Sequence, residues 1–180
     1  MPGKLTKLFS TPHFTIREDA HWIAFLTFTN CERKAKTRLD KYGIENYLPF
    51  MTVHSTDDGK PAKKLQLMST IFARCDLRDY PSLYNHQNCI CRQPNHAGDR
   101  QKQVMLVMES CWQIEQLSEL FDVERVKSST PPGTPCQVSG GPLSGSTGYC
   151  DETQTFFFLP LPEMGAYAKI SLKGKITLSA

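Results

Sequence analysis

The sequence has no long hydrophobic run, and this absence limits where the protein works. None of its apolar stretches approaches the roughly 18–20 residues needed to cross a bilayer, so a membrane span is excluded. The start, Met1-Pro2-Gly3-Lys4, leads into no sustained apolar segment of the kind that forms an export signal. We therefore expect a cytoplasmic protein without membrane partners.

The sequence also has little net charge of either sign. Lys and Arg number 21 against 18 Asp and Glu, which gives a formal net charge of +3. A dedicated duplex-DNA binder is usually more basic, so the composition permits contact with nucleic acid without requiring it. With 39% hydrophobic and 22% charged residues, the 180-residue chain has the composition of a folded protein with one compact domain or two small ones.

Recognisable catalytic motifs are missing as well. No glycine-rich phosphate loop precedes a Lys-Ser or Lys-Thr pair, and no nucleophile-elbow serine accompanies a His and an Asp in the order of a triad. The adjacent carboxylates Asp57 and Asp58 precede Gly59, and a turn accounts for them. We expect no enzymatic activity and no cofactor.

The seven cysteines are scattered and odd in number, which favours reduced thiols over a disulfide framework. A cluster of His86, Cys89, Cys91 and His96 raises the alternative of a zinc site, and with it a zinc-dependent enzyme. Zinc sites generally use pairs with two to four intervening residues, whereas one residue separates Cys89 from Cys91. Such spacing points two thiols to opposite sides of a strand, so we predict no metal.

The first half of the chain alternates strand and helix signals. Residues 1–20 lack a periodic pattern and are predicted to be a flexible tail. Residues 22–28 are apolar on both of the faces that a strand would present alternately. This pattern is typical of a strand buried on both sides. An apolar stripe with four- and three-residue spacing predicts a helix over 31–42, with Asn30 as its N-cap and Gly43 just past its end.

Two further strands are predicted over 44–53, interrupted by Pro49, and over 65–75. Residues 104–108 form a fourth strand candidate, and Ser110 is placed to cap a final helix. The order predicts an α+β domain over 21–125, in which helices pack on one face of an antiparallel sheet.

The composition changes after Val126. Residues 126–135 are rich in Ser, Thr, Pro and Gly, and they predict a linker. From 136 to 180 short β segments alternate with tight turns, which predicts a small all-β barrel of SH3-like type. In the run Phe156-Phe157-Phe158, at least one ring is expected to face outward because strand faces alternate.

Two blocks of this sequence resemble the NusG family of transcription elongation factors. Trp22-Ile23-Ala24-Phe25, Cys31-Glu32-Arg33-Lys34-Ala35 and Gly43-Ile44-Glu45-Asn46-Tyr47-Leu48-Pro49-Phe50 resemble its N-terminal domain: a leading Trp strand, a basic helix and a "G-I-E-x-Y-L-P" strand entry. After the linker, Val138-Ser139-Gly140-Gly141-Pro142-Leu143-Ser144-Gly145-Ser146-Thr147-Gly148 resembles the KOW motif of the second domain.

This resemblance implies a two-domain transcription elongation or antitermination factor. The first domain is expected to bind the clamp helices of RNA polymerase through an apolar cleft lined by Tyr47, Leu48, Pro49, Phe50, Ile71 and Phe72. The helix carries basic residues that either solvate its outer face or lie over upstream or non-template DNA, namely Arg33, Lys34, Lys36, Arg38 and Lys41.

The KOW motif residues of the barrel are Val138, Gly141, Pro142, Gly145 and Gly148. The glycines are expected to serve tight turns or positions where a Cβ would clash. By resemblance, the barrel docks either a ribosomal protein or the termination factor Rho.

The sequence departs from the general factor of the family. Residues 68–73 read Met-Ser-Thr-Ile-Phe-Ala, where the general factor has a "P-G-Y" turn before the phenylalanine, so a specialised paralogue is predicted. Because KOW barrels also occur in ribosomal proteins, an RNA-binding or ribosome-associated protein is the alternative.

Overall fold

A computed structural model describes residues 13–54, 59–76, 78, 80–92, 101–173 and 178–179. The chain divides into two compact units. The N-terminal unit comprises His13–Met51 and Lys63–Trp112, and the C-terminal unit includes Thr52–Ala62 and Gln113–Ala180.

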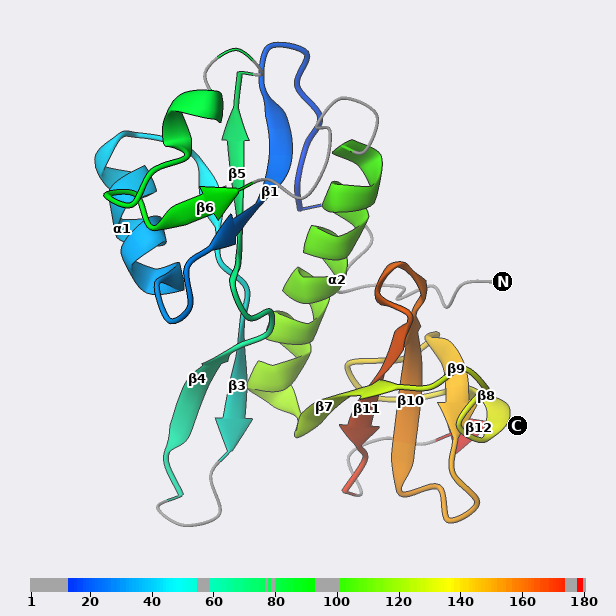
Figure 1. The fold of residues 1–180 in the computed structure, drawn as a ribbon. Helices are drawn as coiled ribbons and strands as arrows, with labels where there is room; N and C mark the ends of the chain where they lie inside the picture. Colours follow the sequence, from blue (N-terminus) through cyan, green and yellow to red (C-terminus); the bar gives the residue numbers. More distant parts are fainter. Residues whose placement is uncertain are drawn as a thin grey trace. The chain divides into compact units, whose positions relative to one another are not determined.

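The first half of the chain forms strands and helices in the order β1 (His21–Thr27), α1 (Glu32–Lys41), β2 (Asn46–Tyr47), β3 (Phe50–His54), β4 (Pro61–Leu65), β5 (Thr70–Cys75), the 3-10 helix η1 (Tyr80–Leu83), β6 (Ile90–Arg92) and α2 (Gln101–Leu120). Antiparallel pairing gives a four-stranded sheet with the order β2-β5-β1-β6, and β3 pairs separately with β4 (Figure 1).

Strand β1 is central in the four-stranded sheet and buried on both faces, as its sequence predicts. Ile23 and Phe25 enter one core with Ala35 and Leu39 of α1. Trp22 enters a second core that includes methionines of α2. The helices therefore cover opposite faces of the sheet (Figure 1), and the expectation that both pack on one face is wrong. The alternation of side chains along β1 requires this, because each of its faces is apolar.

Helix α1 ends as its sequence predicts but begins differently. Gly43 has φ +68°, its N–H donates to the Asp40 carbonyl, and the Ile44 N–H donates to the Leu39 carbonyl at 3.0 Å, which is the Schellman pattern. At the start, Cys31 occupies the N-cap position, and the predicted cap Asn30 has φ +59°. Asn30 adopts this conformation because it lies in the turn closed by the Cys31 N–H and the Phe28 carbonyl at 3.0 Å.

Pro49 separates β2 from β3, so the second predicted strand is divided where the proline stands. The third is divided too, since β4 ends at Leu65 and β5 begins at Thr70. Only β5 joins the central sheet, where it pairs with both β1 and β2.

The predicted strand over 104–108 is wrong, because these residues belong to α2. The predicted cap Ser110 lies within the same helix and is buried. A short apolar run fits a strand and a buried helix equally, and here Met105, Met108 and Cys111 continue the run at helical spacing. The resulting helix has one long face to set against the sheet.

Residues 13–20 are not the loose tail expected for 1–20, and residues 1–12 lie outside the described residues. Phe14 is buried, with its ring centroid 5.4 Å from that of Trp22 and 4.9 Å from that of Tyr47. Its backbone N–H donates to Glu109 Oε1 at 2.6 Å. Apolar burial and a charge-assisted hydrogen bond together hold this segment against α2.

The C-terminal unit is a small all-β module built on one antiparallel sheet. Its elements are β7 (Val123–Lys127), β8 (Thr134–Val138), β9 (Thr147–Cys150), β10 (Phe156–Leu161), the 3-10 helix η2 (Pro162–Met164), β11 (Ala166–Ser171) and β12 (Leu178–Ser179). The strand order is β12-β8-β9-β10-β11-β7. The predicted fold class, an α+β region followed by a small all-β module, is confirmed. Of the residues assigned to a linker, 126–127 lie in β7 and 134–135 lie in β8.

The rings of β10 divide between core and surface. Phe157 and Phe158 are buried, and Phe156 is half-buried beneath the Lys169 ammonium, which lies 4.3 Å from the ring centroid. Phe156 is the outward ring that the alternation of strand faces requires.

Gly148 lies where two strands approach closely. A Cβ built on it would lie 2.4 Å from the Phe158 carbonyl oxygen and 2.7 Å from the Phe157 ring. Both distances are below van der Waals contact, and the nearer atom belongs to the backbone. This position therefore excludes every side chain.

We predict that Gly148→Ala lowers the free energy of unfolding of the full chain by roughly 1–3 kcal/mol, the usual range for overpacking a rigid site. Gly165→Ala is the matched control, because Gly165 has φ +55° and open space around its missing Cβ. Strain alone should lower its stability by about 1 kcal/mol. Urea unfolding of both variants checks the order, and equal losses would contradict the packing argument.

Candidate functional site

The six residues expected to line a polymerase cleft lie on or beside β2 and β5. Tyr47 ends β2, Phe50 begins β3, and Leu48 and Pro49 connect the two strands, whereas Ile71 and Phe72 are in β5. Leu48, Pro49, Ile71 and Phe72 are buried. Tyr47 and Phe50 are half-buried and reach the surface.

The structure distributes these residues over both faces of the sheet and does not gather them into one cleft. Leu48 and Ile71 belong to the core beneath α1, with Phe50 packed against it. Phe72 belongs to the core beneath α2, where the Tyr47 ring lies 6.2 Å from its own. Their consecutive positions cause this separation, because neighbours along a strand point to opposite faces.

The basic residues of α1 occupy its outer surface. Arg33, Lys34, Arg38 and Lys41 are exposed. The Arg33 guanidinium lies 4.7 Å from the centroid of the Phe50 ring. Lys36 is half-buried, and its ammonium contacts Asp40 and Asn46 at 3.2 Å. Helix α1 thus presents the stripe Lys34, Arg38 and Lys41 to solvent.

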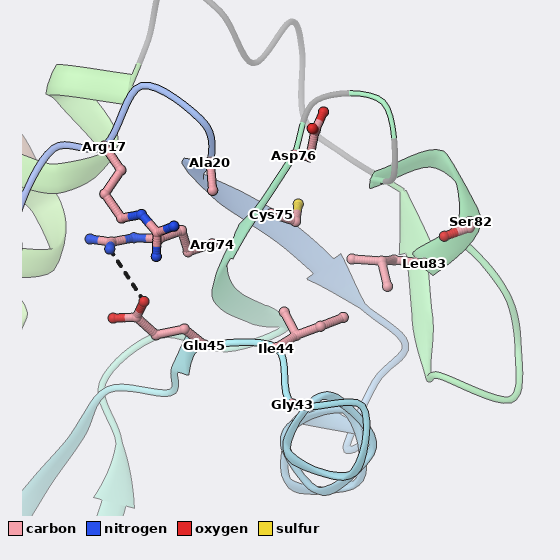
Figure 2. Close-up of a pocket in the computed structure, with 10 residues that line it drawn as sticks. All are labelled: Arg17, Ala20, Gly43, Ile44, Glu45, Arg74, Cys75, Asp76, Ser82 and Leu83. Carbon is pink, nitrogen blue, oxygen red and sulfur yellow. Dashed lines mark ion pairs between the residues drawn. The ribbon is translucent and has the colours of Figure 1, made fainter.

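A cavity of about 310 Å³ opens at one end of the same sheet (Figure 2). Its lining residues come from the segment before β1, the end of α1, β5 and η1, namely Arg17, Ala20, Gly43, Ile44, Glu45, Arg74, Cys75, Asp76, Ser82 and Leu83. Figure 2 shows the Arg17 and Arg74 guanidinium groups close together on one side, with Ile44 and Leu83 on the other.

Arg74 is the unexpected residue of this cavity, because its charged side chain is only 7% exposed. Its Nη1 atom lies 3.3 Å from Glu45 Oε2, its Nη2 donates to the Thr15 carbonyl at 2.5 Å, and its guanidinium lies 5.0 Å from the Trp22 ring centroid. Three partners compensate for removing the charge from water. The sequence contains one signal for the importance of Arg74, because it is the single charged residue within the apolar strand 71–75.

Two carboxylates at or near this cavity, Asp76 and Asp19, have lowered pKa values. Hydrogen bonds from Arg78 lower the pKa of Asp76 to about 2, and the hydrogen bond from Arg17 lowers the pKa of Asp19. Neither group is a proton donor at neutral pH. The ten lining residues include two carboxylates, Glu45 and Asp76, and no histidine.

The predicted Cys and His cluster is only partly visible, because His96 lies outside the described residues. The His86 ring stacks on Phe28, with 4.5 Å between centroids, and the Cys91 thiol donates to the Leu26 carbonyl at 3.3 Å. Across the described ranges, no three His, Cys, Asp or Glu side chains converge in a way that could hold a metal ion. Nor does any helix there have the length and apolarity needed to span a membrane.

The residues of the KOW-like segment form a tight turn in the C-terminal unit. Val138 is buried, Pro142 is exposed, and Gly141 and Gly145 have φ +78° and +87°. The Gly145 N–H closes the turn on the Val138 carbonyl at 2.7 Å. The glycines therefore have the conformational role expected of them, since L side chains rarely adopt these angles.

We predict that Arg74→Lys lowers the free energy of unfolding by about 1–3 kcal/mol, because an ammonium cannot reach Glu45 and Thr15 while stacking on Trp22. Arg17→Lys is the matched control, since its pair with Asp19 is exposed, and it should change stability by no more than about 0.5 kcal/mol. Urea unfolding followed by tryptophan fluorescence measures both. A tolerated Arg74→Lys would mean that the buried charge needs none of these partners.

Comparisons with known proteins identify one family. A family model described as "Transcription termination factor nusG" matches residues 20–110, which is half of the chain. Among solved structures, one of NusG from Thermotoga maritima, concerning its domain interaction, is similar at 14% identity and a TM-score of 0.35, covering 89% of this chain and 92% of that one. No curated protein matches. From the family match, the chain belongs to the NusG family.

Proposed function

We propose that this protein is a non-enzymatic transcription elongation or antitermination factor that binds RNA polymerase through its N-terminal unit. The observation that carries the proposal is the family match over residues 20–110, which falls almost entirely on that unit. The expected cleft and its partner, the clamp helices of the polymerase, come from the family resemblance.

The burial of the six predicted cleft residues limits which of them RNA polymerase could contact directly. Ile71 and Phe72 are 0% and 2% exposed, so they support the docking surface from inside. Tyr47 lies on β2, an edge strand of the sheet, and Phe50 directly follows Pro49 at the start of β3. Half-buried aromatic side chains at an edge combine rigidity with accessible apolar area, as anchors of interfaces do. We therefore propose Tyr47 and Phe50 as the residues that contact RNA polymerase directly.

We predict that Tyr47→Ala weakens binding of the full chain to core RNA polymerase by about tenfold or more, because an aromatic anchor contributes roughly 1.4 kcal/mol or more. Biolayer interferometry with immobilised polymerase measures the affinity. Thermal unfolding is followed in parallel, because Tyr47 also contacts Phe14 and Phe72.

Tyr84→Ala provides the matched control. Tyr84 is also a half-buried tyrosine, but it packs on the α1 side of the sheet, 5.8 Å from Phe25 between ring centroids. Both variants should lose similar stability, and only Tyr47→Ala should lose affinity. Equal affinities for the two folded variants would exclude Tyr47 as an anchor.

We further propose that the exposed stripe of α1 faces nucleic acid in the elongation complex. Lys34, Arg38 and Lys41 recur at spacings of four and three residues, so they share one face of the helix. Lys36 is already engaged with Asp40 and Asn46. Cations in such a stripe bind phosphates without reading sequence, and their binding weakens as salt rises.

We predict that Lys34→Gln/Arg38→Gln weakens binding to a DNA duplex with an open bubble and lowers the slope of log affinity against log salt by about 1–2. The charge-matched control is Lys63→Gln/Lys64→Gln, which removes two exposed cations from β4. Fluorescence anisotropy at several salt concentrations measures the slope. The same slope for both double variants would show that only net charge matters.

The C-terminal unit is proposed to dock a second protein, either a ribosomal protein or Rho, as the KOW resemblance implies. Its support is the KOW-like turn of Val138, Gly141, Pro142, Gly145 and Gly148. The alternative of an RNA-binding or ribosome-associated protein predicts binding to ribosomes without binding to polymerase. A pull-down with core polymerase and with ribosomes separates the two.

A further inference from the structure

Strand β7 belongs to the C-terminal sheet but places no side chain in its core. It is an edge strand and pairs antiparallel with β11, with Val123 opposite Ile170 and Lys127 opposite Ala166. None of its side chains is buried, whereas β8, β9, β10 and β11 each contribute buried residues. The pairing of β7 therefore adds backbone hydrogen bonds and surface contacts to this unit, but no buried apolar side chain.

The segment that contains β7 is held at both of its ends. Phe121 is buried just after α2, and its N–H donates to the Leu117 carbonyl at 2.9 Å. Gly133 lies against β9, where a Cβ would be 2.1 Å from the Cys150 carbonyl oxygen. We call residues 122–132, which lie between these two fixed points, the strap. Its position depends on whether β7 is paired with β11.

Two exposed ion pairs join the strap to β11 and the residues that follow it. Lys169 Nζ lies 3.6 Å from Glu124 Oε2, and Lys173 pairs with Asp122. The Glu124 side chain is 70% exposed. Ion pairs in water contribute little to stability and are screened by salt. The strap is therefore held mainly by backbone pairing, with a small contribution that depends on ionic strength.

We propose that β7 is a reversible latch, which pairs with β11 to keep the connection between α2 and the C-terminal sheet short and unpairs to release the strap as a tether. With the latch closed, only Phe121 and Asp122 separate α2 from β7. With the latch open, residues 122–132 extend to at most roughly 40 Å. An edge strand without buried side chains belongs to the part of a structure that opens most readily. The connection can therefore have two lengths while the core of the sheet stays intact.

The two lengths set how far the C-terminal unit reaches when it docks a second protein, and this use of the latch rests on the proposed function. A short connection restricts the volume that a docking unit can search. A longer tether extends its reach and changes the effective concentration at which it meets a partner. The opening itself is a property of the chain alone, so a latch that fails its test leaves the proposed binding to polymerase standing.

The backbone geometry of β11 identifies the amides that report opening. The Ser171 N–H donates to the Asp122 carbonyl of the strap at 3.0 Å. Because N–H directions alternate along a strand, the N–H groups of Tyr167 and Lys169 also face β7. The N–H of Ala168, between them, faces β10. Opening of the latch therefore exposes alternate amides of one strand and leaves the intervening ones protected.

The test is amide hydrogen exchange of the isotope-labelled full chain, followed by NMR. The protected amides of β7 and those of Tyr167 and Lys169 should share one protection factor, at least about tenfold lower than that of Ala168. Glu124→Gln should lower the shared value by a further factor of roughly two to five, because it removes an exposed ion pair. Glu152→Gln removes an exposed carboxylate outside the strap and should leave it unchanged.

Val126→Pro provides an independent readout, because proline at this position, opposite Tyr167, cannot donate to the ladder. It should hold the latch open, so that Tyr167 and Lys169 lose protection while Ala168 and β10 keep theirs. Three results would overturn the proposal: exchange of β7 in step with Ala168, no protection of β7 at all, or loss of protection throughout the C-terminal sheet in Val126→Pro.

Discussion

The N-terminal unit depends on one strand that is buried on both sides. Successive residues of β1 point alternately into the core beneath α1 and the core beneath α2, and Phe25 is completely buried. A strand of this kind can form only if each face of the sheet has its own helix. The basic helix α1 and the long helix α2 are therefore both needed to close the same sheet, and little of either face is left for a partner.

This constraint moves the accessible features to the margins of the sheet. Tyr47 lies on the edge strand β2, and the exposed Cys91 lies on the opposite edge strand, β6. Between them, Arg74 enters the core beneath α2 from β5, where Trp22, Thr15 and Glu45 share its charge. A buried charge with three partners makes the position of β5 specific, because removing any partner leaves polar groups unsatisfied.

The parts of this fold that the sequence predicted are those in which one physical requirement dominates. The two apolar faces of β1, the stripe of α1 and the positive φ of Gly43 each admit one reading. The segment 104–108 admits two, because the same apolar run suits a strand or a buried helix, and only its continuation through Cys111 decides. The burial of Phe14 and Arg74 could not be predicted, since it rests on contacts with residues distant in sequence. The expected cleft residues, which came from the family resemblance, do not share a face because neighbours along a strand point to opposite sides of the sheet.

The two edges of the sheet are energetically separable. In the order β2-β5-β1-β6, three strand spacings lie between β2 and β6, which amounts to roughly 14 Å. Groups that far apart, with no shared partner, usually contribute additively to stability. The aromatic surface at β2 keeps the geometry that β5 and Phe14 give it. A change at the β6 edge should therefore leave the β2 edge unaltered, because the centre of the sheet is packed on both faces.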